Sequence, residues 1–359
     1  MKKKIALLLS AATLCGLCLG LSGCGGGAKQ VVNVYNWGEY IDESIFDTFE
    51  KETGIHVNYS TFETNEALYS TLKSGGSSYD VIIPSDYMVS RMIQEDMLEE
   101  LDFDNIPNAQ QIDLSQFNIK EDVLSYDPGN KYSVPYAWGS VGIIYNTKKV
   151  TGPVVGWGAL FDEANKGQVL MFNNSRDAIG LALKYLGYSL NTTDEAQIKE
   201  ATNLLIRQKG GGIVQAYVMD QIFEKLISGE AAIGPYYAGD AITMIEENPD
   251  LAFCSPKEGT NLFLDAMCIP KGAENKENGE AFINFMCNPD IMVKNADVTG
   301  YCVPSKAAYA LLDEETQENT IAYPSETAME NMEAFTNLPE HILALYDSEW
   351  SRLTTAKAG

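Results

Sequence analysis

Two aromatic rings and a carboxylate lie within four residues of one another near the start of the chain, at Trp37, Glu39 and Tyr40. The faces of aromatic rings attract positive charge, and a carboxylate accepts hydrogen bonds from an ammonium group. This combination suits an organic cation. The alternative is a core tryptophan beside a solvated glutamate, and these three residues alone do not decide between the two.

A short strand must position these residues. Valines at 31, 32 and 34 predict a buried strand that ends near Asn36 and Gly38. In an open α/β sheet, ligands bind outside the carboxyl ends of the strands. A further apolar strand is predicted over 79–84, and we expect a second binding loop after it, at 85–87.

Strands and helices alternate along the chain, which indicates an α/β fold built from parallel βαβ units. Polar, loop-rich sequence over 102–131 separates two such sets. The predicted strands are 31–34, 55–60, 79–84, 141–146, 169–172, 231–234 and 262–269. The predicted helices are 44–52, 65–73, 89–95, 177–186, 194–208, 220–228 and 280–287, with mostly helical sequence from there to Leu353.

Residues 1–23 are predicted to be a lipoprotein signal peptide, because a head of three lysines precedes an apolar run and small residues. The run Leu21-Ser22-Gly23-Cys24 resembles the bacterial lipobox, in which the cysteine is lipidated and becomes the mature N-terminus. Residues 24–30 would then be the lipidated Cys24 and a flexible tether. An ordinary signal peptide cut nearby is the alternative. Either kind of signal peptide would place the protein outside the cytoplasm, and lipidation at the lipobox would anchor it to the cell membrane.

The chain is strongly acidic. Its formal net charge of −25 becomes −28 once the leader, with three lysines and no acidic residue, is removed. Nucleic-acid binding needs a basic surface, so a nucleic-acid partner is excluded. An acidic protein attracts polycations, although solubility alone would account for the charge equally well.

Histidine and cysteine are too sparse for most enzymatic or metal chemistry. His56 and His341 are the only histidines, and the cysteines at 254, 268, 287 and 302 show no CxxC spacing. A zinc site or a Ser-His-Asp triad is therefore hard to build, and we expect neither a cofactor nor an enzyme. A glycosidase with two carboxylates remains a formal alternative. The four cysteines could form disulfides or stay as buried thiols.

An ordered set of motifs resembles the spermidine/putrescine-binding lipoproteins that serve polyamine ABC importers. No single motif is decisive, but the set covers nearly the whole mature chain. It comprises YNWGEY at 35–40, FEKETGIHV at 49–57, YSTFETNE at 59–66, PSDY at 84–87, PYAWG at 135–139, LGYS at 186–189, PKEG at 256–259, Asp265 ahead of Ile269-Pro270, and TGY at 299–301.

The resemblance implies a two-lobed, type II periplasmic-binding fold with a ligand cleft between the lobes. The chain would cross between lobes twice, near 134–138 and 262–265. Lobe 1 would comprise residues 31–135 plus 264–309, and lobe 2 would comprise 136–263 plus 310–359. Hinge closure would bury the ligand.

The resemblance also implies an aromatic box for the methylene chain of a polyamine and carboxylates for its amines. The matching positions are Trp37, Glu39, Tyr40, Ser85, Tyr87, Asn174, Asp177, Tyr237, Phe263, Asp265, Tyr301 and Thr336. Relatives carry an acid where this chain has Asn174, tryptophan at Tyr237 and Phe263, and glutamine at Thr336. The lost acid leaves the preference between spermidine and putrescine open.

Three of the matched positions are carboxylates. Asp265 interrupts an apolar run and is expected to pair with a buried ammonium, because buried charge must be paired. Glu39 and Asp177 would then serve the other end or the middle amine. Structural roles are the alternatives: an arginine partner for Asp265, a helix cap for Asp177, and a surface position for Tyr87.

The function expected from these residues and the resemblance is that of a monomeric, lipid-anchored polyamine receptor that delivers its ligand to an ABC permease. The same fold could instead bind agmatine, an amino acid, thiamine or ferric iron. An amino acid would need an arginine for its carboxylate, and Arg91 and Arg176 are available. A third alternative is an adhesin or signalling lipoprotein that has lost its ligand.

Overall fold

The structure is a computed structural model that describes residues 30–75 and 78–359. The predicted signal peptide, residues 1–23, and the lipidation site Cys24 lie outside the described residues. Within the described ranges, none of the helices combines the length and the apolar character that a membrane crossing requires. The four cysteines in these ranges are free thiols, and all but Cys254 are buried.

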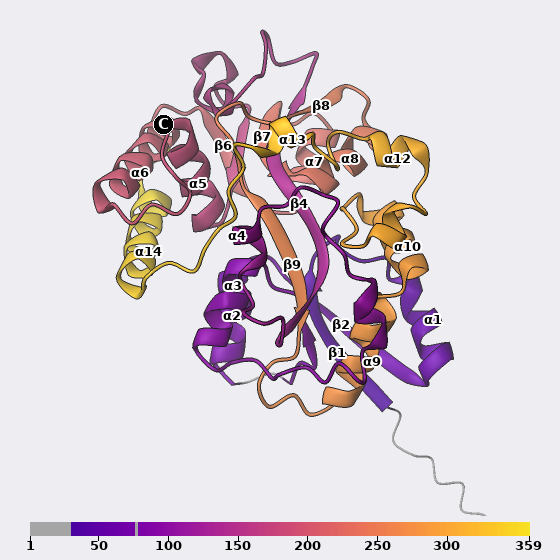
Figure 1. Ribbon diagram of the computed structural model, residues 1–359. Helices are drawn as coiled ribbons and strands as arrows, with labels where there is room; N and C mark the ends of the chain where they lie inside the picture. Colours follow the sequence, from indigo (N-terminus) through magenta and orange to yellow (C-terminus); the bar gives the residue numbers. More distant parts are fainter. Residues whose placement is uncertain (1–29, 76–77) are drawn as a thin grey trace, which may run out of the picture.

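A mixed sheet runs through the middle of the molecule (Figure 1). In the described part of the chain it has nine strands, in the order β2-β1-β3-β9-β4-β7-β5-β6, with β8 also paired to β4. β1 pairs in parallel with β2 and β3, which confirms the predicted βαβ pattern. The strands are β1 (Gln30–Trp37), β2 (Ile55–Phe62), β3 (Val81–Ile82), β4 (Ser133–Asn146), β5 (Val169–Phe172), β6 (Val214–Val218), β7 (Ile233–Tyr237), β8 (Leu251–Cys254) and β9 (Leu262–Cys268).

β4 and β9 are the antiparallel centre of the sheet. The first part of β4, residues 133–140, pairs with β9, and its last part, 141–146, pairs with β7 and β8. β4 therefore belongs to both ends of the sheet. It is longer than the predicted strand 141–146 because Pro135 does not break it: the register shifts between Pro135 and Ala137, and a bulge of this kind accommodates a proline.

Helices cover both ends of the sheet. α1 ends where predicted, because Gly54 adopts the left-handed conformation at φ 77°. α5, α6 and α14 pack together at the β6 end (Figure 1). β6, β8, α4 and α8 were not predicted; α4 lies in the stretch 102–131, which was expected to be loop. The helices are α1 (Ser44–Thr53), α2 (Asn65–Lys73), α3 (Asp86–Gln94), α4 (Glu121–Leu124), α5 (Ser175–Tyr185), α6 (Glu195–Gly210), α7 (Ile222–Ile227), α8 (Ala238–Glu247), α9 (Lys276–Met286), α10 (Pro289–Thr299), α11 (Lys306–Tyr309), α12 (Glu314–Glu318), α13 (Glu326–Met329) and α14 (Glu340–Thr355).

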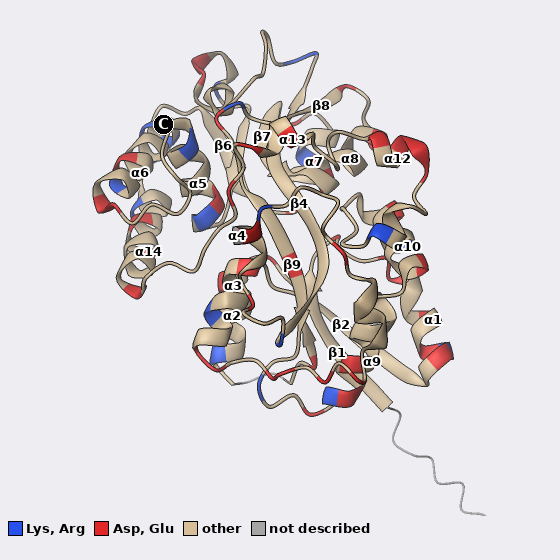
Figure 2. Cartoon of the chain, in the orientation of Figure 1, with Lys and Arg blue, Asp and Glu red and all other residues tan. Residues whose placement is uncertain are grey.

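Apolar side chains fill the space between the sheet and its helices. Val34 on β1, Ile143 on β4 and Phe172 on β5 are all fully buried in one continuous core cluster. Charged residues are concentrated on the surrounding helices and loops, whereas the strands carry few (Figure 2). The exception in the centre is β9, whose one acidic residue, Asp265, is buried.

Candidate functional site

A cavity, partly open to solvent, lies where the carboxyl ends of several strands meet. Trp37 ends β1, Phe62 ends β2 and Tyr237 ends β7, and all three line the cavity. This is the position expected for a binding site in an open α/β sheet. Of its lining residues, nine are aromatic and seven are acidic, and none is lysine, arginine or histidine. The acidic ones are Glu63, Glu66, Asp86, Asp177, Asp220, Asp240 and Asp265.

The structure brings ten of the twelve predicted site residues to this cavity. Glu39 does not line it: it is exposed in a turn with φ 49°. Thr336 is also exposed, and its neighbour Phe335 lines the cavity in its place. The ten are Trp37, Tyr40, Ser85, Tyr87, Asn174, Asp177, Tyr237, Phe263, Asp265 and Tyr301.

Asp265 is the central carboxylate of the cavity, and only 4% of it is exposed. The hydroxyl of Tyr40 donates to its Oδ2 at 2.8 Å. Its Oδ1 is buried and accepts no hydrogen bond of good geometry from the described residues, although the Ser85 side chain lies near enough to the carboxylate to lower its pKa. No lysine or arginine among the described residues forms an ion pair with it. Burial raises the pKa of Asp265 to about 7, and the nearby charge of Asp177 adds to the shift.

Asp177 lies in the first turn of α5 and faces the same cavity. The helix is capped by Asn174, whose Oδ1 accepts from the Asp177 backbone N–H at 2.8 Å, so capping is not the role of Asp177. The Asn174 amide and the Tyr237 hydroxyl both donate to Asp177 Oδ2, at 2.8 and 3.0 Å. Burial raises the pKa of Asp177 to about 6 despite these bonds.

The loop predicted at 85–87 is instead the start of α3. Ser85 is the N-cap residue, and Asp86 and Tyr87 belong to the first turn. Tyr87 is buried rather than at the surface, and its hydroxyl donates to Glu66 Oε1 at 3.0 Å. Asp86 accepts from the backbone N–H groups of Tyr87 and Leu264, at 2.6 and 3.3 Å, so this buried carboxylate ties α3 to β9.

Further carboxylates of the cavity were missed by the sequence analysis, among them Glu63, Glu66, Asp220 and Asp240. Asp240 accepts from Tyr301 at 2.8 Å, and Asp220 accepts from Tyr236 at 3.0 Å. Burial raises the pKa of Asp240 well above its usual range, and the charge of Asp220 adds to this. Asp240 follows the carboxyl end of β7 by three residues, and that signal could have found it. Asp220 has no comparable local signal.

Aromatic rings form a connected wall. Tyr301 meets Tyr40 edge to face, with the ring centroids 4.4 Å apart, and meets Phe263 at 6.1 Å. Tyr237 meets Phe263 at 5.5 Å. Gly239 permits this packing, because a Cβ there would lie 2.5 Å from the Tyr301 ring. Such a wall offers ring faces and edges to an alkyl chain that carries cationic groups.

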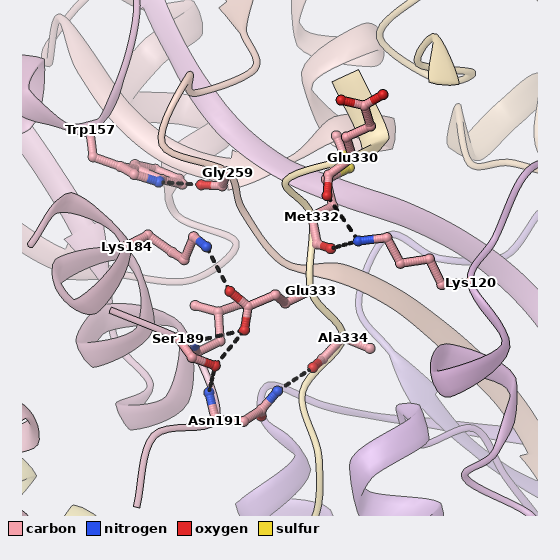
Figure 3. Close-up of polar contacts among 11 residues, drawn as sticks. Lys120, Trp157, Lys184, Ser189, Asn191, Gly259, Glu330, Met332, Glu333 and Ala334 are labelled. Atoms are coloured by element: carbon pink, nitrogen blue, oxygen red, sulfur yellow. Dashed lines mark hydrogen bonds and ion pairs between the residues drawn. The ribbon is translucent and has the colours of Figure 1, made fainter. Parts of the chain in front are cut away.

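The segment 330–338, which we call the strap, brings Phe335 to the cavity. Figure 3 shows the polar contacts that its residues Glu330, Met332, Glu333 and Ala334 make with their surroundings. It joins α13 to α14. Its Glu333 carboxylate accepts from Lys184 at 2.7 Å and from Ser189 at 2.5 Å. Backbone carbonyls of the strap accept from side chains on both sides of it: those of Glu330 and Met332 from Lys120, and that of Ala334 from Asn191.

Comparison with known proteins places the chain among solute-binding proteins. The family described as bacterial extracellular solute-binding protein matches residues 44–324. The spermidine/putrescine-binding periplasmic protein of Escherichia coli is 34% identical over 335 residues, which cover 93% of each chain.

Solved structures agree with this assignment. A putative spermidine/putrescine ABC transporter protein from Listeria monocytogenes superposes with a TM-score of 0.86 and 37% identity, over 91% of this chain and 100% of that one. A lipoprotein of Treponema pallidum superposes with a TM-score of 0.78 and 27% identity, over 90% and 99% of the two chains. The mixed α/β fold is therefore that of periplasmic binding proteins.

Proposed function

Because the chain belongs to the family of bacterial extracellular solute-binding proteins, which bind solutes rather than catalyse reactions, we propose that it captures a polyamine for an ABC importer. Relatives that cover nearly the whole chain are named for spermidine and putrescine. The observation that carries the proposal is Asp265 Oδ1, a buried carboxylate oxygen without a partner among the described residues, in a cavity lined by rings and acids. An ammonium group is the ligand such an oxygen lacks.

The expected energies suffice for this function. Each buried methylene of the ligand contributes about 0.8 kcal/mol, and each cation–π contact adds about 0.5–2 kcal/mol. Micromolar binding needs about 8 kcal/mol. Four methylenes and a few ring contacts therefore offset the cost of ordering the ligand. The carboxylates then offset the desolvation penalty of the buried amines, because each ammonium exchanges water for a charged acceptor.

Other ligands of this fold fit the cavity less well. An amino acid needs an arginine for its carboxylate, yet Arg91 pairs with Glu95 at 3.0 Å and neither it nor Arg176 lines the cavity. Ferric iron needs phenolate ligands, but burial raises the pKa of Tyr40 and Tyr301 well above the usual range. Agmatine and thiamine are cations and stay as competitors to be tested.

We also propose that the two ends of the sheet are lobes that close on the ligand. Lobe 1 comprises 31–135 plus 264–309, and lobe 2 comprises 136–263 plus 310–359. The pairing of β4 with both ends supports crossings at β4 and β9. Closure of two lobes around a charged ligand removes it from water, which strengthens every carboxylate–ammonium contact.

The site of lipidation is proposed to be Cys24, as the lipobox-like sequence before it suggests. A related solved protein is a lipoprotein. The anchor would hold the receptor outside the cytoplasm, close to the permease. A Cys24→Ser variant should leave the membrane fraction of cells; a variant that stays there as firmly as the natural protein would refute the anchor.

Isothermal titration calorimetry tests the function. The protein should bind spermidine or putrescine with one-to-one stoichiometry and leave glutamate and ferric citrate unbound. Agmatine and thiamine belong in the same series. If agmatine or thiamine binds more tightly than both spermidine and putrescine, it is the ligand instead. Turnover of a glycoside panel would show that the protein is an enzyme. No binding of any cation would favour an adhesin.

A further inference from the structure

Arg176 is a buried cation directly behind the aromatic wall. It lies on α5, and 3% of it is exposed. Its guanidinium carbon lies 4.9 Å from the centroid of the Tyr87 ring, 4.4 Å from that of Phe335 and 5.4 Å from that of Tyr346. Tyr87 and Phe335 line the cavity, whereas Arg176 does not. The guanidinium therefore contacts these two rings from outside the ligand space.

Charge pairing does not account for this position. Within the described residues, Arg176 forms no ion pair, and its Nε has no hydrogen-bond partner. It donates only to the Thr336 carbonyl, at 3.3 Å, and to Asn191 Oδ1, at 3.5 Å. A buried cation without a carboxylate partner is costly, and next to a cavity for cations its charge opposes the ligand.

The planar shape of the guanidinium does account for the position. A guanidinium stacks on ring faces and donates in the plane of its fork, whereas an ammonium does neither. Through these contacts Arg176, on α5, links three other elements: α3, which carries Tyr87; the strap, which carries Phe335; and α14, which carries Tyr346. Among the described residues, Arg176 is the one cationic side chain in contact with both the Tyr87 ring and the Phe335 ring.

We propose that Arg176 is a positioning residue: by stacking on Tyr87 and Phe335 and holding the strap at Thr336, it fixes the two rings that close the Asp177 end of the cavity. The inference rests on the proposed function, since it explains how a polyamine receptor tolerates a cation beside its site. It adds a residue that never touches the ligand. It also explains how the strap, rather than a helix or strand, can present a ring with a fixed orientation.

Two variants separate shape from charge. Arg176→Lys keeps the charge, and Arg176→Met removes it at similar length. If the planar group positions the rings, both variants weaken spermidine binding by about tenfold or more. If charge alone matters, Arg176→Met binds spermidine as tightly as the natural protein or more tightly, and Arg176→Lys is unchanged; either result would overturn the proposal. Arg207→Met, an exposed arginine of α6, is the matched control and should bind normally.

The pH profile supplies a readout that a general folding defect would not move. The charge of Arg176 lowers the pKa of Asp177, so its loss in Arg176→Met should shift the pH midpoint of spermidine affinity upward, while Arg176→Lys keeps the midpoint. An unshifted midpoint in Arg176→Met would contradict the proximity on which the proposal depends. The other groups that face Asp177 are Asn174, Tyr237, Tyr236, Tyr87, Glu66 and Asp265.

Failure of this inference can be told from failure of the function. If the natural protein binds no polyamine, the function is wrong. If it binds spermidine and Arg176→Lys binds equally well, only the role of Arg176 is wrong. Arg176→Lys retains the buried charge and most of the side-chain volume, so it decides the question even where Arg176→Met does not fold.

Discussion

Asp265 combines two properties that a structural residue rarely has together. It is almost fully buried, and one of its two oxygens lacks a partner among the described residues. Such an atom costs stability in the empty protein, and an ammonium ligand removes that cost. The hydroxyl of Tyr40 holds the other oxygen at 2.8 Å and so fixes the orientation of the carboxylate before the ligand arrives.

Substitution of Asp265 should therefore weaken binding. Asp265→Asn keeps the shape of the side chain but leaves a buried ammonium without its counter-charge, which costs about 2 kcal/mol or more. We expect the Kd for spermidine to rise at least tenfold, as measured by calorimetry. Asp347→Asn, at an exposed position on α14, is the control. Equal affinity of Asp265→Asn and the natural protein would remove Asp265 from the site.

Protonation of two carboxylates should make binding depend on pH. The pKa of Asp265 is about 7 and that of Asp177 about 6, so both are largely ionised only at pH 8. Polyamine amines resemble lysine and stay protonated over this range. Affinity should fall from pH 8 to pH 5, and binding near pH 6.5 should release protons, which calorimetry in two buffers measures. Constant affinity over this range would contradict the buried pairing.

The same pKa values fix the sign of the effect on stability. The folded-state pKa of each carboxyl lies above the unfolded value of about 3.9, so the folded state binds more protons in between. The stability they contribute is present below pH 4 and is lost as pH rises through 6 to 7. Spermidine should therefore raise the melting temperature more at pH 8 than at pH 5.

At the scale of elements, the strap depends on one ion pair. Lys184 is buried, and Glu333 is its carboxylate partner at 2.7 Å. Glu333→Gln should lower the free energy of unfolding by about 1–3 kcal/mol, because it leaves a buried ammonium with a weaker acceptor, and it should weaken spermidine binding through Phe335. Denaturant unfolding measures the first effect. Glu195→Gln, which breaks an exposed pair with Lys199, should change stability by less than about 0.5 kcal/mol.

Gly259, in the loop between β8 and β9, packs closely against the strap. Gly259 has φ +87°, and a Cβ there would lie 2.0 Å from the Asn331 carbonyl oxygen. Gly54 has a similar φ of +77° but nothing within 4 Å. Both alanine variants pay about 1–2 kcal/mol for the left-handed backbone. Gly259→Ala should lose about 1–3 kcal/mol more in chemical denaturation, because the strap must shift; equal losses would mean that the strap yields freely.

Local sequence signals predicted most of the elements and part of the site. The end of α1 at Gly54 and the pairing of rings with acids at strand ends were predictable, because each depends on neighbours in sequence. Glu39 was expected in the cavity, but a positive φ in its turn leaves its side chain in solvent. Asp220 and Phe335 reach the cavity only through tertiary packing, against Gly38 and Arg176 respectively, which no local pattern reports.

For the whole molecule, fold and charge serve the same function. The sheet joins two sets of strands through β4 and β9, and the cavity lies where strand ends from both sets meet. The acidic chain, with a formal net charge of −25, would attract a polycation from a distance. Within the cavity, we expect the carboxylates to replace water around the amines and the rings to replace it around the methylenes.

A crystal structure of the spermidine complex is the most direct test. We predict an ammonium nitrogen about 3 Å from Asp265 Oδ1, with the alkyl chain against Tyr237 and Phe263. Spermidine bound elsewhere, or an anion in the cavity with Asp265 turned away, would contradict the account.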